Sequence, residues 1–294
     1  MMDRRLFLFA SGAALIGAAA SRRRPIISPI VPAPDFTAIE ARLGRGGRLG
    51  VAALDTGSGR RIAWREGERF ALCSTFKMAL AAAILTGVDR GTRALADELT
   101  YGASDLTDYG PVTRANLARG RLSIESLCAA IVEVSDNAAA NLLLRQIGGP
   151  AGLTAFFRRC GDRVSRLDRY EEALGTNLPG DPRDTTSPAA MLALMHRLLL
   201  GNVLSPASRA RLIGWMDGAV TGRQRLRAGF PAGWRVGDKT GNGANGAAND
   251  LAFARPPNRA PILVASYMSE GTADRAARDA AHAEVARAVA AAFG

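Results

Sequence analysis

Lysine is almost absent from this chain of 294 residues. Of its 38 basic residues, only Lys77 and Lys239 are lysine, and the other 36 are arginine. Arginine stays charged and presents a planar fork, whereas lysine is a compact ammonium whose pKa a protein can lower until it accepts a proton. We infer that the two lysines occupy positions where arginine cannot replace the function of lysine. The alternative is that two lysines persist by chance.

Histidine and cysteine are also scarce. Neither histidine, His196 or His282, lies in a motif, which argues against a histidine-activated cysteine nucleophile. The histidines and cysteines show no zinc-ligand spacing, and we expect neither a metal nor an organic cofactor. Because three cysteines cannot all pair within one chain, we predict free, buried thiols at Cys73, Cys128 and Cys160.

The apolar run near the N-terminus is short. It covers about 15 residues from Leu6 to Ala20, fewer than a membrane-spanning helix needs. It follows the pair Arg4 and Arg5, so we predict an export signal over residues 1–20 that resembles the twin-arginine type, and a periplasmic protein. An ordinary secretory signal or an uncleaved anchor is the alternative. Residues 21–34, rich in proline and arginine, are predicted to be a flexible linker.

Long basic runs are missing as well, although the net charge is +11. The arginines are scattered, apart from a tight run at 22–24, and no basic helix carries interleaved aromatic residues. These features argue against a nucleic-acid partner. A small anionic substrate fits the charge equally well.

The apolar pattern predicts, in order, a short helix at 35–45, two strands, a block of helices, three strands and a closing helix. Strands from both ends of the chain must meet in one sheet, so the helical block is an insertion. We therefore predict an α/β protein of the α+β type, with a five-stranded antiparallel sheet flanked by terminal helices. This catalytic domain spans 35–294. Its sheet lobe covers about 35–72 and 219–294, its helical lobe about 73–218, and the active site lies between them.

Ser74 and Lys77 stand three residues apart at the start of an apolar helix, CSTFKMALAAAIL, so both side chains lie on one face. The helix N-terminus stabilises a developing negative charge. A serine hydroxyl becomes a good nucleophile when a neighbouring base takes its proton, and a lysine with a lowered pKa can contribute to that. The four-residue pattern alone is weak, because it occurs by chance in many chains.

Two further motifs follow, Ser135–Asn137 (SDN) and Lys239–Gly241 (KTG). Together with the Ser74 motif, they resemble the signature of class A β-lactamases and penicillin-binding proteins, in the same order. Both lysines of the chain fall inside these motifs.

The long polar segment 162–186 separates the two families. Loops of this length in compact domains are usually functional. DRYEEALGTNLPGDPRDTT resembles the Ω-loop of class A β-lactamases, in which a glutamate, here Glu171, holds a hydrolytic water, and an arginine and an aspartate, here Arg169 and Asp184, pin the loop. The alternative for this pair is two unrelated surface charges. We expect Glu172 to be a solvated carboxylate. The resemblance to class A β-lactamases runs from about residue 36 to the C-terminus.

This resemblance implies the catalytic roles. Ser74 attacks the lactam carbonyl, Lys77 and Glu171 share its activation, and Ser135 passes a proton to the departing nitrogen. Which of Lys77 and Glu171 is the acylation base stays open. The backbone N–H groups of Ser74 and Asn242 form the oxyanion hole.

The resemblance also implies the substrate contacts. Asn137 binds the side-chain amide of the substrate, and the segment Lys239, Thr240 and Gly241 binds its carboxylate. Arg225 matches a carboxylate-binding arginine of some members; the alternative is a surface arginine. Tyr109 resembles the aromatic residue that lines the cleft, and the alternative is a packing role.

Two departures from the family pattern stand out. Gly175 occupies the position where members usually carry an asparagine that helps to hold the water, so we expect slower deacylation for some substrates. Some carbapenem-hydrolysing members link the residue before the nucleophile to one just past KTG by a disulfide. Cys73 matches the first position, but Gly243 occupies the second, so carbapenemase activity is not indicated.

The sequence therefore predicts a monomeric hydrolase of small β-lactam molecules, detached from the membrane after signal cleavage. The first alternative is an enzyme like a penicillin-binding D,D-peptidase, which acylates and deacylates slowly. The second is a non-catalytic β-lactam sensor. Glu171 and its loop favour the hydrolase. The substrate spectrum among penicillins, cephalosporins and carbapenems stays open.

Overall fold

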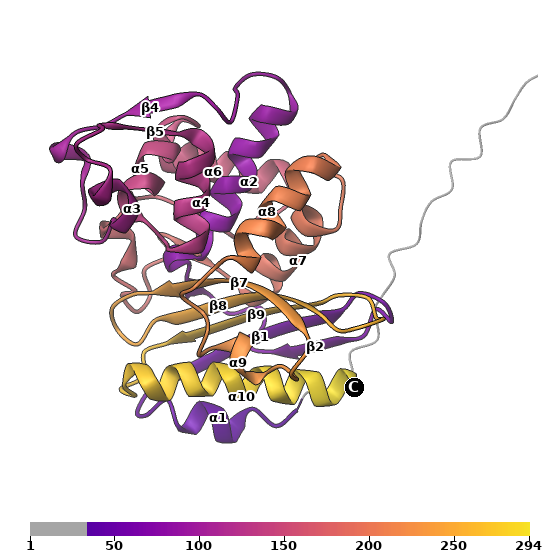
Figure 1. The fold of residues 1–294 in the computed structure, drawn as a ribbon. Helices are drawn as coiled ribbons and strands as arrows, with labels where there is room; N and C mark the ends of the chain where they lie inside the picture. The colour runs from indigo at the N-terminus through magenta and orange to yellow at the C-terminus, as the bar shows by residue number, and fades with distance from the viewer. Residues whose placement is uncertain (1–33) are drawn as a thin grey trace, which may run out of the picture.

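A five-stranded antiparallel sheet crosses the lower half of the molecule (Figure 1). The computed structural model describes residues 34–294. The strand order is β2-β1-β9-β8-β7, so the two N-terminal strands pair with the three C-terminal ones through β1 and β9. The strands are β1 (Arg48–Asp55), β2 (Arg61–Trp64), β7 (Arg235–Asn242), β8 (Ala248–Arg255) and β9 (Ile262–Ser269). The predicted fold class is confirmed.

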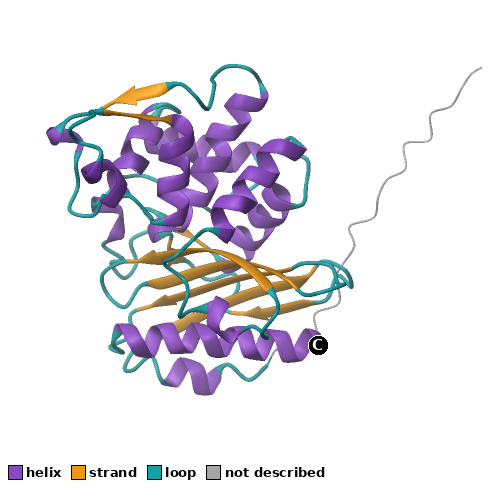
Figure 2. Ribbon diagram, in the orientation of Figure 1, coloured by secondary structure: helices purple, strands orange, loops and turns teal. Residues whose placement is uncertain are grey.

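The first and last helices of the described residues, with one short helix that precedes β7, cover one face of this sheet (Figure 2). They are α1 (Thr37–Ala41), α9 (Leu226–Gly229) and α10 (Arg275–Phe293). Asp274 caps α10 by accepting the N–H of Ala277. Apolar residues of these helices, such as Val285 and Phe293, pack with strand residues in one core.

Most of the remaining helices form the upper half and pack on the other face of the sheet (Figure 1). They are α2 (Phe76–Asp89), α3 (Pro111–Ala115), α4 (Ile124–Glu133), α5 (Asn137–Arg145), α6 (Gly149–Arg159), α7 (Pro188–Leu199) and α8 (Pro206–Asp217). Helix α2 is the central one, because every residue from 76 to 85 is buried. Ser123, Ser187 and Ser205 cap their helices with side-chain oxygens.

Several short elements were not predicted, because two or three residues carry no periodicity. They are the strand pairs β3 (Phe70–Ala71) with β6 (Thr185–Thr186) and β4 (Glu98–Thr100) with β5 (Arg121–Ser123), and 3-10 turns at Cys73–Thr75, Ala103–Asp105 and Ala173–Gly175. The first pair matters most, because it joins the segment before Ser74 to the end of the long loop.

The predicted export signal, and the linker except Pro34, lie outside the described residues. Within 34–294, no helix is both long and apolar enough to cross a membrane. All three cysteines are free and buried, as predicted. The described part of the chain contains no group of three or more His, Cys, Asp or Glu side chains arranged to hold a metal ion.

Candidate active site

Ser74 lies in the 3-10 turn Cys73–Thr75, which leads directly into α2. The preceding residue, Cys73, has a left-handed φ of 42°, a conformation that costs free energy in a non-glycine residue and clusters at functional sites. Strand β7 approaches this turn closely at Gly241. A Cβ there would lie 3.0 Å from the Cys73 Cβ and 3.2 Å from the Leu72 carbonyl oxygen. Glycine therefore lets β7 run beside the nucleophile.

Lys77 lies one helical turn after Ser74 and is completely buried. Its ammonium Nζ lies 3.0 Å from Ser74 Oγ and 2.9 Å from Glu171 Oε1. It also donates to the Ser135 carbonyl oxygen at 2.9 Å and to Asn137 Oδ1. The structure thus brings residues from the first two motifs and the long loop around one ammonium group.

Glu171 completes a triangle with Ser74 and Lys77, since its Oε1 lies 3.4 Å from Ser74 Oγ. The side chain of Asn141 fixes its backbone in both directions. Asn141 Nδ2 donates to the Glu171 carbonyl at 2.9 Å, and Asn141 Oδ1 accepts the Glu171 N–H at 3.0 Å. Sequence reasoning missed Asn141. The available signal was an asparagine one turn after Asn137 on an otherwise apolar helix face.

Ser135 lies between the two lysines. Its hydroxyl Oγ accepts from Lys239 Nζ at 3.1 Å and from Lys77 Nζ at 3.4 Å. Ser135 has a left-handed φ of 64°, and the next residue, Asp136, caps α5 by accepting the N–H of Ala139. A hydroxyl that contacts two buried ammonium groups is well placed to relay a proton.

Lys239, on β7, is also completely buried. Burial, followed by the nearby charge of Lys77, lowers the pKa of Lys239 to about 7. Behind it, burial raises the pKa of Asp238 to about 6 and that of Asp250 well above the usual range. Arg227 Nε donates to Asp238 Oδ2 at 2.8 Å. Sequence reasoning missed these buried carboxyl groups.

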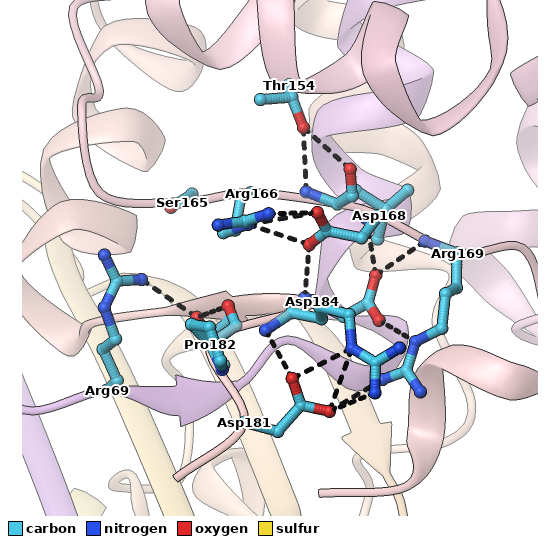
Figure 3. A network of polar contacts seen from close by, with 12 residues as sticks. Arg69, Thr154, Ser165, Arg166, Asp168, Arg169, Asp181, Pro182 and Asp184 are labelled. Atoms are coloured by element: carbon cyan, nitrogen blue, oxygen red, sulfur yellow. Dashed lines mark hydrogen bonds and ion pairs between the residues drawn. The ribbon is translucent and has the colours of Figure 1, made fainter.

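The neck of the Ω-loop is closed by two aspartates that bind each other's backbone (Figure 3). Asp184 Oδ1 accepts the N–H groups of Asp168 and Arg169 at 2.7 and 3.0 Å, and Asp168 Oδ2 accepts the N–H of Asp184 at 2.9 Å. Arg169 Nε lies 2.5 Å from Asp184 Oδ2. The Leu72 N–H donates to the Asp184 carbonyl at 2.7 Å, which ties the neck to the segment before Ser74.

The tip of the Ω-loop is fastened to the turn between β7 and β8. Asn177 Nδ2 donates to the Asn245 carbonyl at 2.9 Å, and Asn245 Nδ2 donates back to the carbonyls of Thr176 and Asn177 at 3.0 and 3.2 Å. The Gly175 carbonyl accepts the N–H of Ala244 at 2.9 Å. A Cβ at Gly243 would lie 2.7 Å from the Gly175 oxygen, so glycine allows this close approach.

The opposite wall carries Tyr109, which lines the pocket and is half exposed. The Tyr109 carbonyl accepts the N–H of Asn137 at 3.0 Å. Glu172 was predicted to be a solvated carboxylate; it is exposed, but its Oε1 accepts the N–H of Asp108 at 2.8 Å. Glu172 therefore connects the Ω-loop to the loop that carries Tyr109.

A pocket of about 640 Å³ joins these groups. Its lining includes Ser74, Tyr109, Ser135, Asn137, Thr240, Gly241 and Asn242, seven of the residues singled out in the sequence. The Thr240 hydroxyl donates to that of Thr221 at 2.7 Å. Ser74 and Asn242, the two expected oxyanion donors, line the same cavity.

Arg225 departs from expectation, because it does not line the pocket. It is 2% exposed, and its guanidinium is occupied by protein groups. Its Nε donates to Asp279 Oδ1 at 2.6 Å, and its Nη1 donates to the carbonyls of Gly241 and Asn249 at 3.1 and 2.8 Å. Its Nη2 donates to Asn242 Oδ1. In this arrangement the Arg225 guanidinium does not reach a substrate carboxylate directly. Arg225 instead stabilises β7 through its hydrogen bonds to the Gly241 carbonyl and to Asn242.

Comparisons with known proteins agree with one another. A family model described as the β-lactamase enzyme family matches residues 35–293. The chain is 44% identical over 269 residues to the β-lactamase AST-1 of Nocardia asteroides, covering 92% of this chain and 86% of that protein. It is 46% identical over 243 residues to the carbapenem-hydrolysing β-lactamase KPC of Klebsiella oxytoca, covering 82% and 83%.

Solved structures give the same result. The class A β-lactamase described as that of the last common ancestor of Gram-negative bacteria (GNCA4) is 57% identical and superposes with a TM-score of 0.86, covering 88% of this chain and 98% of that one. An ancestral class A β-lactamase (GNCA) is 55% identical with a TM-score of 0.85, covering 88% and 98%.

Proposed function

The chain belongs to the class A serine β-lactamases, a family of hydrolases, and we propose that it opens β-lactam rings through an acyl-enzyme on Ser74 that Glu171 helps to hydrolyse. The observation that carries this proposal is the triangle of Ser74 Oγ, Lys77 Nζ and Glu171 Oε1, with sides of 3.0, 2.9 and 3.4 Å. A nucleophile within reach of two groups that can accept its proton is the arrangement that acyl transfer requires.

In the proposed acylation, Ser74 Oγ attacks the lactam carbonyl and gives its proton to Lys77 or Glu171. The N–H groups of Ser74 and Asn242 stabilise the resulting oxyanion; removing one such donor typically costs roughly 3–4 kcal/mol of transition-state stabilisation. The lactam nitrogen leaves with a proton from the Ser135 hydroxyl, which Lys77 and Lys239 both contact.

In the proposed deacylation, Glu171 takes a proton from a water molecule that attacks the ester. Asn141 holds the Glu171 backbone, and the neck and tip contacts of the Ω-loop hold the segment around it. Gly175 supplies no side chain near this water. We therefore propose that deacylation limits the turnover of some substrates.

Substrate orientation is proposed to depend on charge and hydrogen bonding. The segment Lys239, Thr240 and Gly241 binds the substrate carboxylate. Asn137 binds the side-chain amide, and Tyr109 packs beside the substrate. We further propose a monomer that needs no cofactor. We also propose export to the periplasm, which rests on the signal-like residues 1–20.

Turnover and intact mass, measured together, test the mechanism. The purified protein is mixed with benzylpenicillin and with a chromogenic cephalosporin. The intact protein mass in quenched samples is measured by mass spectrometry. We expect sustained turnover by the native protein, none by Ser74→Ala, and an accumulated acyl adduct on Glu171→Gln. A stoichiometric adduct on the native protein without turnover would instead support an enzyme like a penicillin-binding protein, or a sensor.

A further inference from the structure

The pocket extends beyond the residues given roles above. Its outer end is lined by Val220, Thr221, Arg223 and Gln224, between α8 and α9, and by residues of the first turns of α10. Arg223 and Arg275 lie here, both exposed; the Arg275 side chain is 75% exposed. Charged groups on the rim of a concave site act on the ligand that enters it.

This end of the pocket carries more positive than negative charge. Among the described residues of its lining, Asp279 is the one carboxylate, and two arginines share it: Arg225 at 2.6 Å and Arg275 at 3.7 Å. No described carboxylate lies within 4.0 Å of the Arg223 guanidinium. Two arginines of the lining, Arg223 and Arg275, thus stand against one carboxylate, and the buried Arg225 already holds that carboxylate more closely than Arg275 does.

Asn242 adds a hydrogen-bond donor to the same region. Its Oδ1 accepts from Arg225 Nη2, and this contact fixes which way the amide points, because a guanidinium has no acceptor. The remaining group, Nδ2, is a donor on an exposed side chain that lines the pocket. The outer end therefore presents an amide and two guanidinium groups to a ligand.

The position of this region relative to Thr240 indicates which part of a substrate reaches it. The ring carboxylate is assigned to Lys239 and Thr240, and the acylamino group to Asn137 on the opposite wall. In a cephalosporin, the C3 substituent is bonded to the carbon next to the one that carries the ring carboxylate. That substituent therefore extends from the Thr240 end of the pocket toward Arg223 and Arg275.

We propose that Arg223 and Arg275 form a second anionic subsite, which favours β-lactams with a further negative charge beside the ring carboxylate. This inference rests on the proposed β-lactamase function and adds a substrate class to it. The subsite acts on binding and acylation through charge attraction, because neither arginine contacts Ser74 or Glu171. Its contribution is exposed to solvent and decreases as salt screens it.

The test uses two cephalosporins that differ only at C3, one with a neutral group and one with a group that ends in a carboxylate. The double variant Arg223→Gln/Arg275→Gln is compared with Arg90→Gln/Arg287→Gln, which removes two exposed charges elsewhere. Arg90 follows the far end of α2, and Arg287 lies 12 residues along α10 from Arg275, about 18 Å away. The kcat/KM of each substrate is measured at low and high salt.

We expect the ratio of kcat/KM values, dianionic to monoanionic substrate, to fall about tenfold in the first double variant, equivalent to about 1.4 kcal/mol. The fall should lie mainly in KM and should shrink at high salt, and the control variant should keep the native ratio. An unchanged ratio in the first variant, or an equal fall in the control, overturns the subsite while leaving the hydrolase intact. If the native protein turns over benzylpenicillin but neither cephalosporin, the subsite is wrong and the hydrolase stands; if it turns over none of the three, both are wrong.

Discussion

At the scale of single residues, the two lysines occupy positions with different demands. Lys77 has five oxygen atoms around its ammonium, from the four residues Ser74, Ser135, Asn137 and Glu171. Lys239 reaches Ser135 Oγ and the Thr240 carbonyl. Both ammonium groups are buried, where a compact donor fits and a planar fork does not. The structure gives a physical reason why these two positions carry lysine rather than arginine.

The lowered pKa of Lys239, about 7, leads to a prediction about pH. A substrate carboxylate binds the protonated ammonium, so kcat/KM of the native protein should fall as pH rises through about 7. The kcat/KM of Lys239→Arg should be roughly tenfold lower, because the planar guanidinium fits this buried position poorly. It should not fall at alkaline pH, however, since arginine stays charged. Initial rates with benzylpenicillin from pH 5.5 to 9 measure both. If kcat/KM of the variant falls at the same pH, the fall is due to the titration of another group.

Gly175 is the second residue with a specific prediction. A Cβ there would meet nothing closer than the Gly243 Cα at 3.9 Å, and its φ is not left-handed, so a side chain can be accommodated. Gly175→Asn should speed deacylation about tenfold for substrates on which the acyl-enzyme accumulates, by adding a hydrogen bond to the attacking water. Gly175→Ala is the control, since it adds a Cβ without a donor. Unchanged deacylation for every substrate tested would refute this role.

At the scale of elements, the Ω-loop shows what sequence could and could not predict. Its position and the residues Arg169, Glu171 and Asp184 followed from motif resemblance. The contacts that shape it did not, because Asn141, Asn177 and Asn245 reach it from α5, from its own tip and from the β7–β8 turn. Hydrogen bonds between residues 68 positions apart leave no periodic pattern. The longer helices, by contrast, were predicted well, since their apolar spacing and capping serines are local, whereas the short helices α3 and α9 were missed.

The Asn177–Asn245 contact predicts an effect on loop motion. Asn245→Ala removes two hydrogen bonds to the loop, those to the carbonyls of Thr176 and Asn177. We expect amide hydrogen exchange across 170–180 to accelerate at least severalfold, because the tip loses bonds that hold it closed. The global unfolding midpoint should change little. Asn258→Ala, at another exposed turn with positive φ, is the matched control. Exchange that is unchanged in the loop would show that the remaining contacts, the Gly175–Ala244 bond and the bonds donated by the Asn177 side chain, are enough to fasten the tip.

At the scale of the whole molecule, the site is built from groups that oppose folding. Two lysines and the carboxyl groups of Asp238 and Asp250 are buried between the sheet and its helices. Burying a charge costs free energy unless its partners compensate. The apolar cores on the two faces of the sheet offset this cost. The molecule therefore gives up some stability at the place where it gains a charged, preorganised cavity.

This trade-off has a measurable pH signature. The folded-state pKa of Lys239, about 7, is below its ordinary value of 10.5, so between these values the unfolded chain binds more protons and stability rises with pH. From pH 7 to 8.5, Lys239 should contribute a rise of about 1–2 kcal/mol to the free energy of unfolding measured in urea, against the opposite effect of Asp250, whose raised pKa makes stability fall as pH rises. Lys239→Met should flatten this rise and be more stable at pH 7, whereas Arg90→Gln should keep the slope. An unaltered slope in Lys239→Met would mean that the buried ammonium is compensated by its hydrogen bonds, and that the cavity costs the fold nothing there.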